Sequence, residues 1–213
     1  MTGLIGIAAV ALVAWFAAGT VWNVAKGRAV LSWMQDGLPA LGERTTVRWL
    51  GSTAVELVIR EARAPFASAS VVVFLEPRDL PWMWGFGRIR GRRDTLIVRG
   101  ALRSPPTVEF EALAPASWSG REALGRVPRE WPVRGAGPGG RVVIHHANAG
   151  ALARADELLD LAGRAGLAVR RLAVRRTEPH LQFHVGLPDS RRSARDFFAA
   201  VQALAAIAER APD

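Results

Sequence analysis

The chain opens with a single uncharged and largely apolar segment, and charged residues become frequent only after it. From Gly3 to Trp22 it consists almost entirely of Ala, Val, Leu, Ile, Gly, Trp and Phe, and no charge appears before Lys26. About twenty helical residues, at about 1.5 Å each, extend roughly 30 Å, which is the thickness of the hydrocarbon core of a bilayer. The pattern therefore predicts a transmembrane helix over residues 1–25.

Two other interpretations of this segment remain open. The first is a cleaved signal peptide, because the small residues Ala17, Ala18 and Gly19 imitate a cleavage site. However, no basic residue precedes the apolar run, and the run is longer than the core of about 7–15 residues that signal peptides use. The second is a buried helix of a soluble protein, which rarely needs so long an apolar run. We therefore expect a membrane anchor.

The charges after the apolar segment predict its orientation. The nearest positive charges all follow it, at Lys26, Arg28, Arg44 and Arg48. Basic residues beside a span stay on the cytoplasmic side. We therefore expect a single-pass protein of the cell membrane, with its N-terminus outside and its body in the cytoplasm. In the juxtamembrane segment, residues 26–42, the apolar residues at 30–34 predict either a short interfacial helix or a plain tether.

Residues 43–113 carry the alternation of apolar and polar positions that is typical of β-strands. Val55, Leu57 and Ile59 share one face of such a strand, with Glu56 on the other. The run 71–75 is apolar throughout and short enough to be a strand that is buried on both faces. Short turns separate these runs, which predicts an antiparallel, β-rich segment of about five strands.

The remaining chain changes pattern twice. Residues 114–140 contain four prolines and six glycines, which predicts a linker or long surface loop. Residues 141–211 then read as strand, helix, strand, strand, helix, with apolar helical faces around Leu158 and Phe197. The predicted fold class is α+β: a transmembrane helix, a β-rich segment and a βαββα unit. Whether the two halves of the body form one domain or two stays open.

Composition narrows the chemistry. The absence of cysteine excludes disulfides and thiolate metal sites. The net charge of +9 rests on arginine, since Lys26 is the only lysine. A basic body beside a membrane is attracted to anionic lipid headgroups by about 1 kcal/mol per basic residue near the surface. The charge would also suit nucleic acid, but no recognised binding motif is present, so we do not expect that partner.

The four histidines do not predict a metal site. His180 and His184 would lie on one strand face but about 13 Å apart, and the neighbours His145 and His146 point to opposite faces. A cross-strand pair of His146 with His184 has no carboxylate at ligand spacing to complete it. We expect a face that is solvated or covered by a helix.

The other motifs do not predict a catalytic or cofactor site either. Residues 135–140 match the dinucleotide pattern G-x-G-x-x-G, but they precede a strand instead of opening a helix, so we interpret them as linker. The chain has no G-x-S-x-G nucleophile motif. The acidic residues at 156, 157 and 160 fit the wet face of a helix, and a catalytic role is not expected for them or for the pair Glu109 and Glu111.

The most suggestive segment combines aromatic and basic residues between Pro81 and Arg103. The residues from Pro81 to Gly87 are expected to form a flexible aromatic loop, and six arginines follow them, opposed only by Asp94. Tryptophan favours the membrane–water interface, and guanidinium groups pair with phosphate. The predicted membrane or partner contacts are Trp82, Trp84, Phe86, Arg88, Arg90, Arg92 and Arg93. The alternative is that the aromatic residues pack inside the body.

Together these features predict a membrane-anchored protein whose body is a non-catalytic interaction or accessory module at the membrane surface. The expected partners are anionic lipid headgroups and a protein that the sequence does not identify. The alternative is a membrane-associated enzyme whose site is assembled from several strands.

Overall fold

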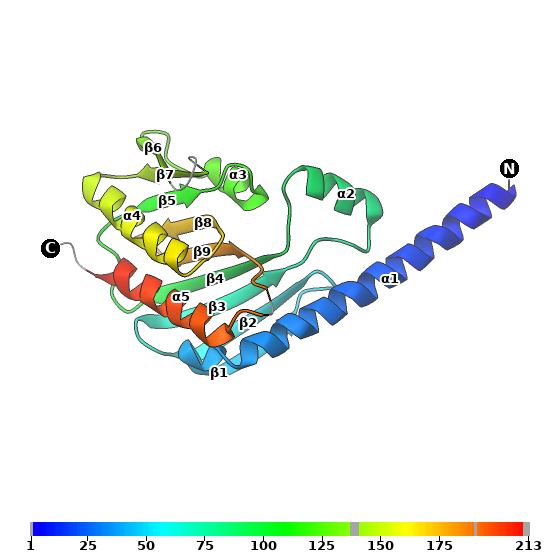
Figure 1. Cartoon of the computed structure of the whole chain (residues 1–213), viewed down its shortest axis with the longest axis horizontal. Helices are drawn as coiled ribbons and strands as arrows, with labels where there is room; N and C mark the ends of the chain where they lie inside the picture. Colours follow the sequence, from blue (N-terminus) through cyan, green and yellow to red (C-terminus); the bar gives the residue numbers. More distant parts are fainter. Residues whose placement is uncertain (1, 137–140, 190, 211–213) are drawn as a thin grey trace.

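The computed structural model describes residues 2–136, 141–189 and 191–210 (Figure 1). It has an α+β architecture, in which a long apolar helix near the N-terminus precedes one large antiparallel sheet. The helical elements are α1 (Thr2–Gln35), η1 (Leu38–Ala40), α2 (Pro81–Ile89), α3 (Trp118–Leu124), α4 (Ala149–Arg164) and α5 (Ala194–Glu209). The predicted α+β class, with an apolar N-terminal helix and an antiparallel sheet, is confirmed.

Nine strands form one sheet in the order β1-β2-β3-β4-β9-β8-β5-β7-β6. Their bounds are β1 (Gly42–Trp49), β2 (Ala54–Ala62), β3 (Phe66–Phe74), β4 (Thr95–Leu102), β5 (Phe110–Leu113), β6 (Val133–Ala136), β7 (Val142–His146), β8 (Val169–Val174) and β9 (Leu181–Gly186). Strand β4 pairs with β9, which places Ile97 opposite His184. Strand β5 lies between β8 and β7. The strands of the predicted β-rich segment and of the predicted βαββα unit therefore lie in one sheet, and neither the predicted strand count nor the βαββα unit is matched exactly.

The segment 114–140, which was expected to be linker or loop, contains helix α3 and strand β6. Helix α3 begins after Ser117, whose hydroxyl accepts a hydrogen bond from the amide of Gly120 at 3.0 Å, as an N-cap residue does. Strand β6 has only four residues with little burial, so it leaves no alternation to detect. Residues 137–140 of the glycine motif lie outside the described residues.

Helices α4 and α5 cover one face of the sheet and enclose the main core. Their buried residues, such as Leu158 and Phe197, pack with Leu172 and Phe183 from β8 and β9. Because side chains alternate along a strand, the neighbours Arg171 and His184 point to the opposite face, where α3 lies. The two faces of the sheet therefore differ: one carries the apolar core and the other carries polar and basic groups.

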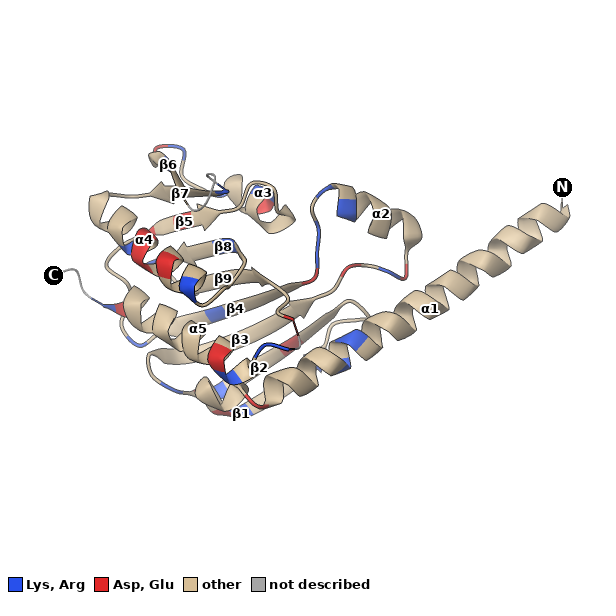
Figure 2. Cartoon of the chain, in the orientation of Figure 1, with Lys and Arg blue, Asp and Glu red and all other residues tan. Residues whose placement is uncertain are grey.

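Helix α1 continues to Gln35, about ten residues beyond the predicted span, and it replaces the expected interfacial helix or tether. It is long and apolar enough to cross a membrane, and its N-terminal half carries no charge (Figure 2). The first half is exposed along its length, whereas the second half packs on the body. Its buried positions recur every three or four residues, at Gly19, Asn23, Gly27, Val30 and Met34.

Candidate membrane-proximal site

The body meets α1 partway along its apolar segment. The indole Nε1 of Trp15 donates a hydrogen bond to the carbonyl of Arg78 at 2.9 Å. One turn later, a Cβ on Gly19 would lie 2.4 Å from that same carbonyl oxygen, so only glycine allows this approach. The chain after β3 therefore lies directly against α1 within residues 15–19.

A polar network ties α1 to the body beside this contact. Arg78 donates two hydrogen bonds to the carboxylate of Asp94, at 2.8 and 3.1 Å, and a third to the side-chain oxygen of Asn23 at 3.2 Å. Lys26 reaches the same carboxylate at 2.5 Å, and the amide of Glu76 donates to it at 2.7 Å. Asp94 and Asn23 are buried. Charge-assisted bonds of this kind are roughly twice as strong as neutral ones.

The network determines the ionisation of Asp94. Burial alone would raise the pKa of this carboxyl, but the hydrogen bonds from Arg78, Lys26 and the Glu76 amide outweigh burial and hold the pKa below its usual value. Asp94 is therefore an anion that holds two cations from different parts of the chain.

Residues 81–89, expected to be a flexible loop, form helix α2. Pro81 lies in its first turn, where a missing N–H costs nothing, and the amide of Trp84 bonds the carbonyl of Leu80 at 2.8 Å. The sequence did not predict this helix, because its two glycines and three bulky aromatic residues have a weak helical propensity. Helix α2 extends beyond the sheet on the side of α1 (Figure 1).

Trp84 holds α2 against α1. Its ring centroid lies 6.4 Å from that of Trp15, and its Nε1 donates to the carboxylate of Glu76 at 2.5 Å. Arg88 stacks over the same ring at 5.5 Å and lies 3.6 Å from the carboxylate of Glu76. Trp84 and Arg88 are thus engaged within the body and position the helix.

The outer side of α2 is apolar and unusually exposed. Its four large apolar side chains are all exposed, at Trp82 (58%), Met83 (44%), Phe86 (56%) and Ile89 (86%). Arg90 lies over the ring of Phe86 at 4.2 Å. Exposed apolar patches that are rimmed by charge mark sites of protein or membrane interaction.

The two remaining predicted contacts lie beyond α2. The guanidinium of Arg93 donates to the carbonyls of Arg88 and Arg92, at 2.9 and 2.7 Å, and so stiffens the turn after the helix. Arg92 lines a cavity. The seven predicted contact residues therefore have three kinds of surroundings. Trp82, Phe86 and Arg90 point outward, Trp84 and Arg88 hold the helix, and Arg92 and Arg93 line the cavity, where Arg93 also stiffens the turn.

The residues that hold α1, α2 and the body together could not be predicted from the sequence. They are Trp15, Lys26, Glu76, Arg78 and Asp94. They come from three separated parts of the chain, so no linear motif joins them. The one available signal was the spacing of Gly19, Asn23 and Lys26 on a predicted helix, which places small and polar groups on one side of an apolar segment.

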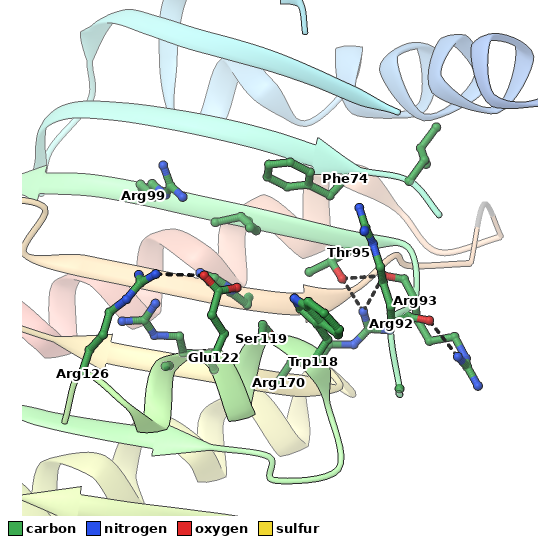
Figure 3. A pocket seen from close by; sticks show the side chains of 16 residues that line it. Phe74, Arg92, Arg93, Thr95, Arg99, Trp118, Ser119, Glu122, Arg126 and Arg170 are labelled. Carbon is green, nitrogen blue, oxygen red and sulfur yellow. Dashed lines mark hydrogen bonds and ion pairs between the residues drawn. The ribbon is translucent and has the colours of Figure 1, made fainter. Parts of the chain in front are cut away.

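A cavity of about 280 Å³ lies between α3 and the polar face of the sheet (Figure 3). Its lining includes six arginines, at positions 92, 93, 99, 126, 170 and 171, and a single carboxylate, Glu122. Glu122 pairs with Arg126 at 2.9 Å. Arg171 forms an ion pair with the buried Glu111 of the neighbouring strand β5, at 2.8 Å. The cavity thus keeps a clear excess of positive charge.

His184 lies in the wall of this cavity and is buried. Burial above all, and then the charges of Arg171, Arg99 and Arg170, lowers the pKa of His184 to about 3. Neither of its ring nitrogens has a hydrogen-bond partner among the described residues, and the same holds for the buried hydroxyl oxygen of Ser119. Two polar groups in this cavity are therefore left without partners.

The other histidines and acidic residues are dispersed. His180 accepts a hydrogen bond from the amide of Leu102 at 2.9 Å, and β8 and β5 separate His146 on β7 from His184 on β9. The described residues contain no group of three or more His, Cys, Asp or Glu side chains able to hold a metal ion. Asp156 pairs with Arg134, and Glu157 pairs with Arg210.

Comparison with models of known protein families gave no match, and comparison with curated proteins gave none either.

Proposed function

We propose that α1 anchors the chain in the cell membrane with the body on the cytoplasmic side, and that α2 is a second contact with the same bilayer. The body would then act as a non-catalytic interaction or accessory module held close to the membrane surface. One observation carries this proposal: Trp84 packs on Trp15 of α1, while the opposite side of α2 leaves its large apolar side chains exposed.

The depth of α2 along α1 supports the proposal. Trp15 precedes Lys26 by eleven residues, or about 16 Å along a helix. With Lys26 above the headgroups, where it pairs with Asp94 of the body, the contact between Trp15 and Trp84 would lie near the boundary of the hydrocarbon. The part of α1 before Gly19 has about 17 residues, at the short end of what spans a bilayer. Exposed apolar groups on α2 would extend the apolar surface at that boundary.

The chemistry of α2 suits an interface with anionic lipid. Tryptophan is enriched at the boundary between membrane and water. Fully burying one large apolar side chain contributes about 1.5–3 kcal/mol. Arg90, next to the exposed ring of Phe86, would meet lipid phosphates at that level and add about 1 kcal/mol. Such a contact would fix the orientation of the body, since α1 alone permits rotation about its axis.

A body held in this way would meet partners in the plane of the membrane at a high effective concentration, so that weak contacts become productive. We propose a protein partner in addition to anionic lipid headgroups. The positive-inside rule supports a cytoplasmic body, since Lys26 and Arg28 follow the apolar half of α1.

Cysteine labelling in membranes tests both parts of the proposal, because the chain contains no native cysteine. Ile89→Cys places a thiol on the outer side of α2, and Val133→Cys places one on β6, where the side chain is 58% exposed. In inside-out vesicles, a water-soluble maleimide should label Val133→Cys quickly and Ile89→Cys at least tenfold more slowly, until detergent is added.

Right-side-out vesicles provide the topology control, since neither thiol should react there. Labelling of Val133→Cys in right-side-out vesicles would contradict a cytoplasmic body. Equal labelling of the two thiols in inside-out vesicles would contradict the second membrane contact.

A further inference from the structure

We infer that the arginine-lined cavity between α3 and the sheet is a binding site for a phosphate group, carried by a small organic phosphate or by a phospholipid headgroup. This inference does not depend on the membrane contact of α2, because the cavity is formed by β3, β4, β8, β9, α3 and the turn after α2.

The first support is a charge that the protein leaves unbalanced. Of the cavity's arginines, Arg92 and Arg99 have guanidinium groups that make no hydrogen bond or ion pair with any other described residue. Among the described residues, the guanidinium of Arg170 donates only to neutral oxygens, the carbonyls of Arg93 and Asp94 and the hydroxyl of Thr95. Guanidinium groups gathered around one hollow repel each other unless an anion binds there. Their planar donors fit phosphate oxygens in pairs.

The second support is the pair of unpartnered polar groups in the same cavity. His184 is only 6% exposed, yet both of its ring nitrogens lack a partner among the described residues. The buried hydroxyl of Ser119 on α3 is unpartnered as well. Leaving a buried polar group unsatisfied is destabilising, so such groups call for a partner that the described chain does not supply. A neutral imidazole donates one hydrogen bond and a serine hydroxyl another, and phosphate oxygens accept both.

The size and the walls of the cavity limit the ligand. A volume of about 280 Å³ lies just below the usual range for small-molecule sites and suits a phosphate with a compact organic group. Trp118 and Phe74 contribute aromatic surface to the wall (Figure 3). The single carboxylate, Glu122, already pairs with Arg126. The site therefore favours an anion and disfavours a cation.

Binding to the full-length protein tests the inference with two probes. Inorganic pyrophosphate, titrated calorimetrically in neutral detergent, represents a soluble phosphate. Phosphatidylglycerol, counted by native mass spectrometry after release from mixed nanodiscs, represents the headgroup. The variant Arg92→Gln/Arg99→Gln removes two unpartnered charges without breaking any ion pair within the described chain. The control Arg191→Gln/Arg195→Gln removes the same charge from exposed positions in and just before α5.

The cavity variant should lower the affinity for at least one probe tenfold or more, whereas the control should change it less than twofold. Ser119→Ala should lower it a further two- to fivefold. Dependence on Arg92 and Arg99 with pyrophosphate identifies a soluble phosphate as the ligand, and dependence with phosphatidylglycerol alone identifies a headgroup. Failure of both probes to bind, or equal losses in the cavity and control variants, would overturn the inference. Slow maleimide labelling at Ile89 would be unaffected by that failure, so the two proposals fail separately.

Discussion

The indole of Trp15, inside the apolar half of α1, donates a hydrogen bond to the backbone carbonyl of Arg78 in the body. The side chain of Arg78 then turns toward Asn23 and Asp94. One residue of the body thus touches α1 at two levels, by its main chain and by its side chain. Helix α1 is therefore a structural element of the body and not a tether, which explains why it continues without a break to Gln35.

Asp94→Asn should destabilise the full-length protein by about 3 kcal/mol, because it leaves Arg78 and Lys26 without their shared carboxylate in a largely buried setting. Thermal unfolding in neutral detergent, followed by circular dichroism, measures this. Glu43→Gln is the matched control, since it breaks an exposed ion pair with Arg63 and should cost less than about 1 kcal/mol. Equal losses in the two variants would show that the network does not hold α1 to the body.

Gly19→Leu should loosen α1 from the chain after β3, because the new Cβ would lie 2.4 Å from the carbonyl oxygen of Arg78. We expect a lower unfolding temperature and faster proteolysis at residues 76–80. Gly6→Leu provides the control, since a Cβ there meets nothing within 4 Å. If Gly19→Leu matched this control, α1 would not be seated as the structure describes.

The free energy of unfolding should decrease as the pH is lowered, because of His184. The pKa of His184 is about 3 in the folded state and near 6.5 when the side chain is exposed. Between these pH values the unfolded chain therefore binds a proton at His184 and the folded protein does not. The contribution is fully present above pH 6.5 and declines by about 1.4 kcal/mol per pH unit as the pH falls toward 3.

Chemical unfolding at several pH values between 6.5 and 4.5 checks this. Subtracting the curve of His184→Gln isolates the histidine from the carboxylates that also titrate there. His146→Gln, at a less buried ring, should retain the wild-type slope. An unchanged slope in His184→Gln would mean that the folded protein binds a proton at His184 as readily as the unfolded chain does, which would contradict the lowered pKa.

The helices and strands whose residues follow a regular apolar and polar pattern could be predicted from the sequence. The apolar N-terminal helix and the antiparallel strands followed from runs and alternation, as at Val55 and Leu57, and the α+β class is confirmed. The joining of all nine strands was missed, because the pairing of β4 with β9 links residues more than eighty positions apart. Helix α2 was missed because tertiary contacts of Trp84, not propensity, hold its aromatic residues in a helix.

The candidate site was predicted in composition but not in arrangement. Its aromatic and basic character was visible between Trp82 and Arg93, whereas the different roles of those residues depend on partners elsewhere. Trp84 faces Trp15, and Arg92 faces a cavity with His184. Sequence spacing could not show either relationship. Trp15 and Trp84 are almost seventy residues apart, and Arg92 and His184 are more than ninety residues apart.

The depth of α2 in a bilayer shows directly whether this helix is a second membrane contact. A nitroxide attached to Ile89→Cys in the full-length protein, reconstituted into nanodiscs with phosphatidylglycerol, reports its exposure to oxygen, which concentrates in lipid, and to a water-soluble nickel chelate. Val133→Cys carries the matched label on β6. If α2 contacts the bilayer, position 89 should lie at or just below the lipid phosphates, and position 133 should be fully accessible to the chelate. Full chelate access at position 89 would contradict a second membrane contact.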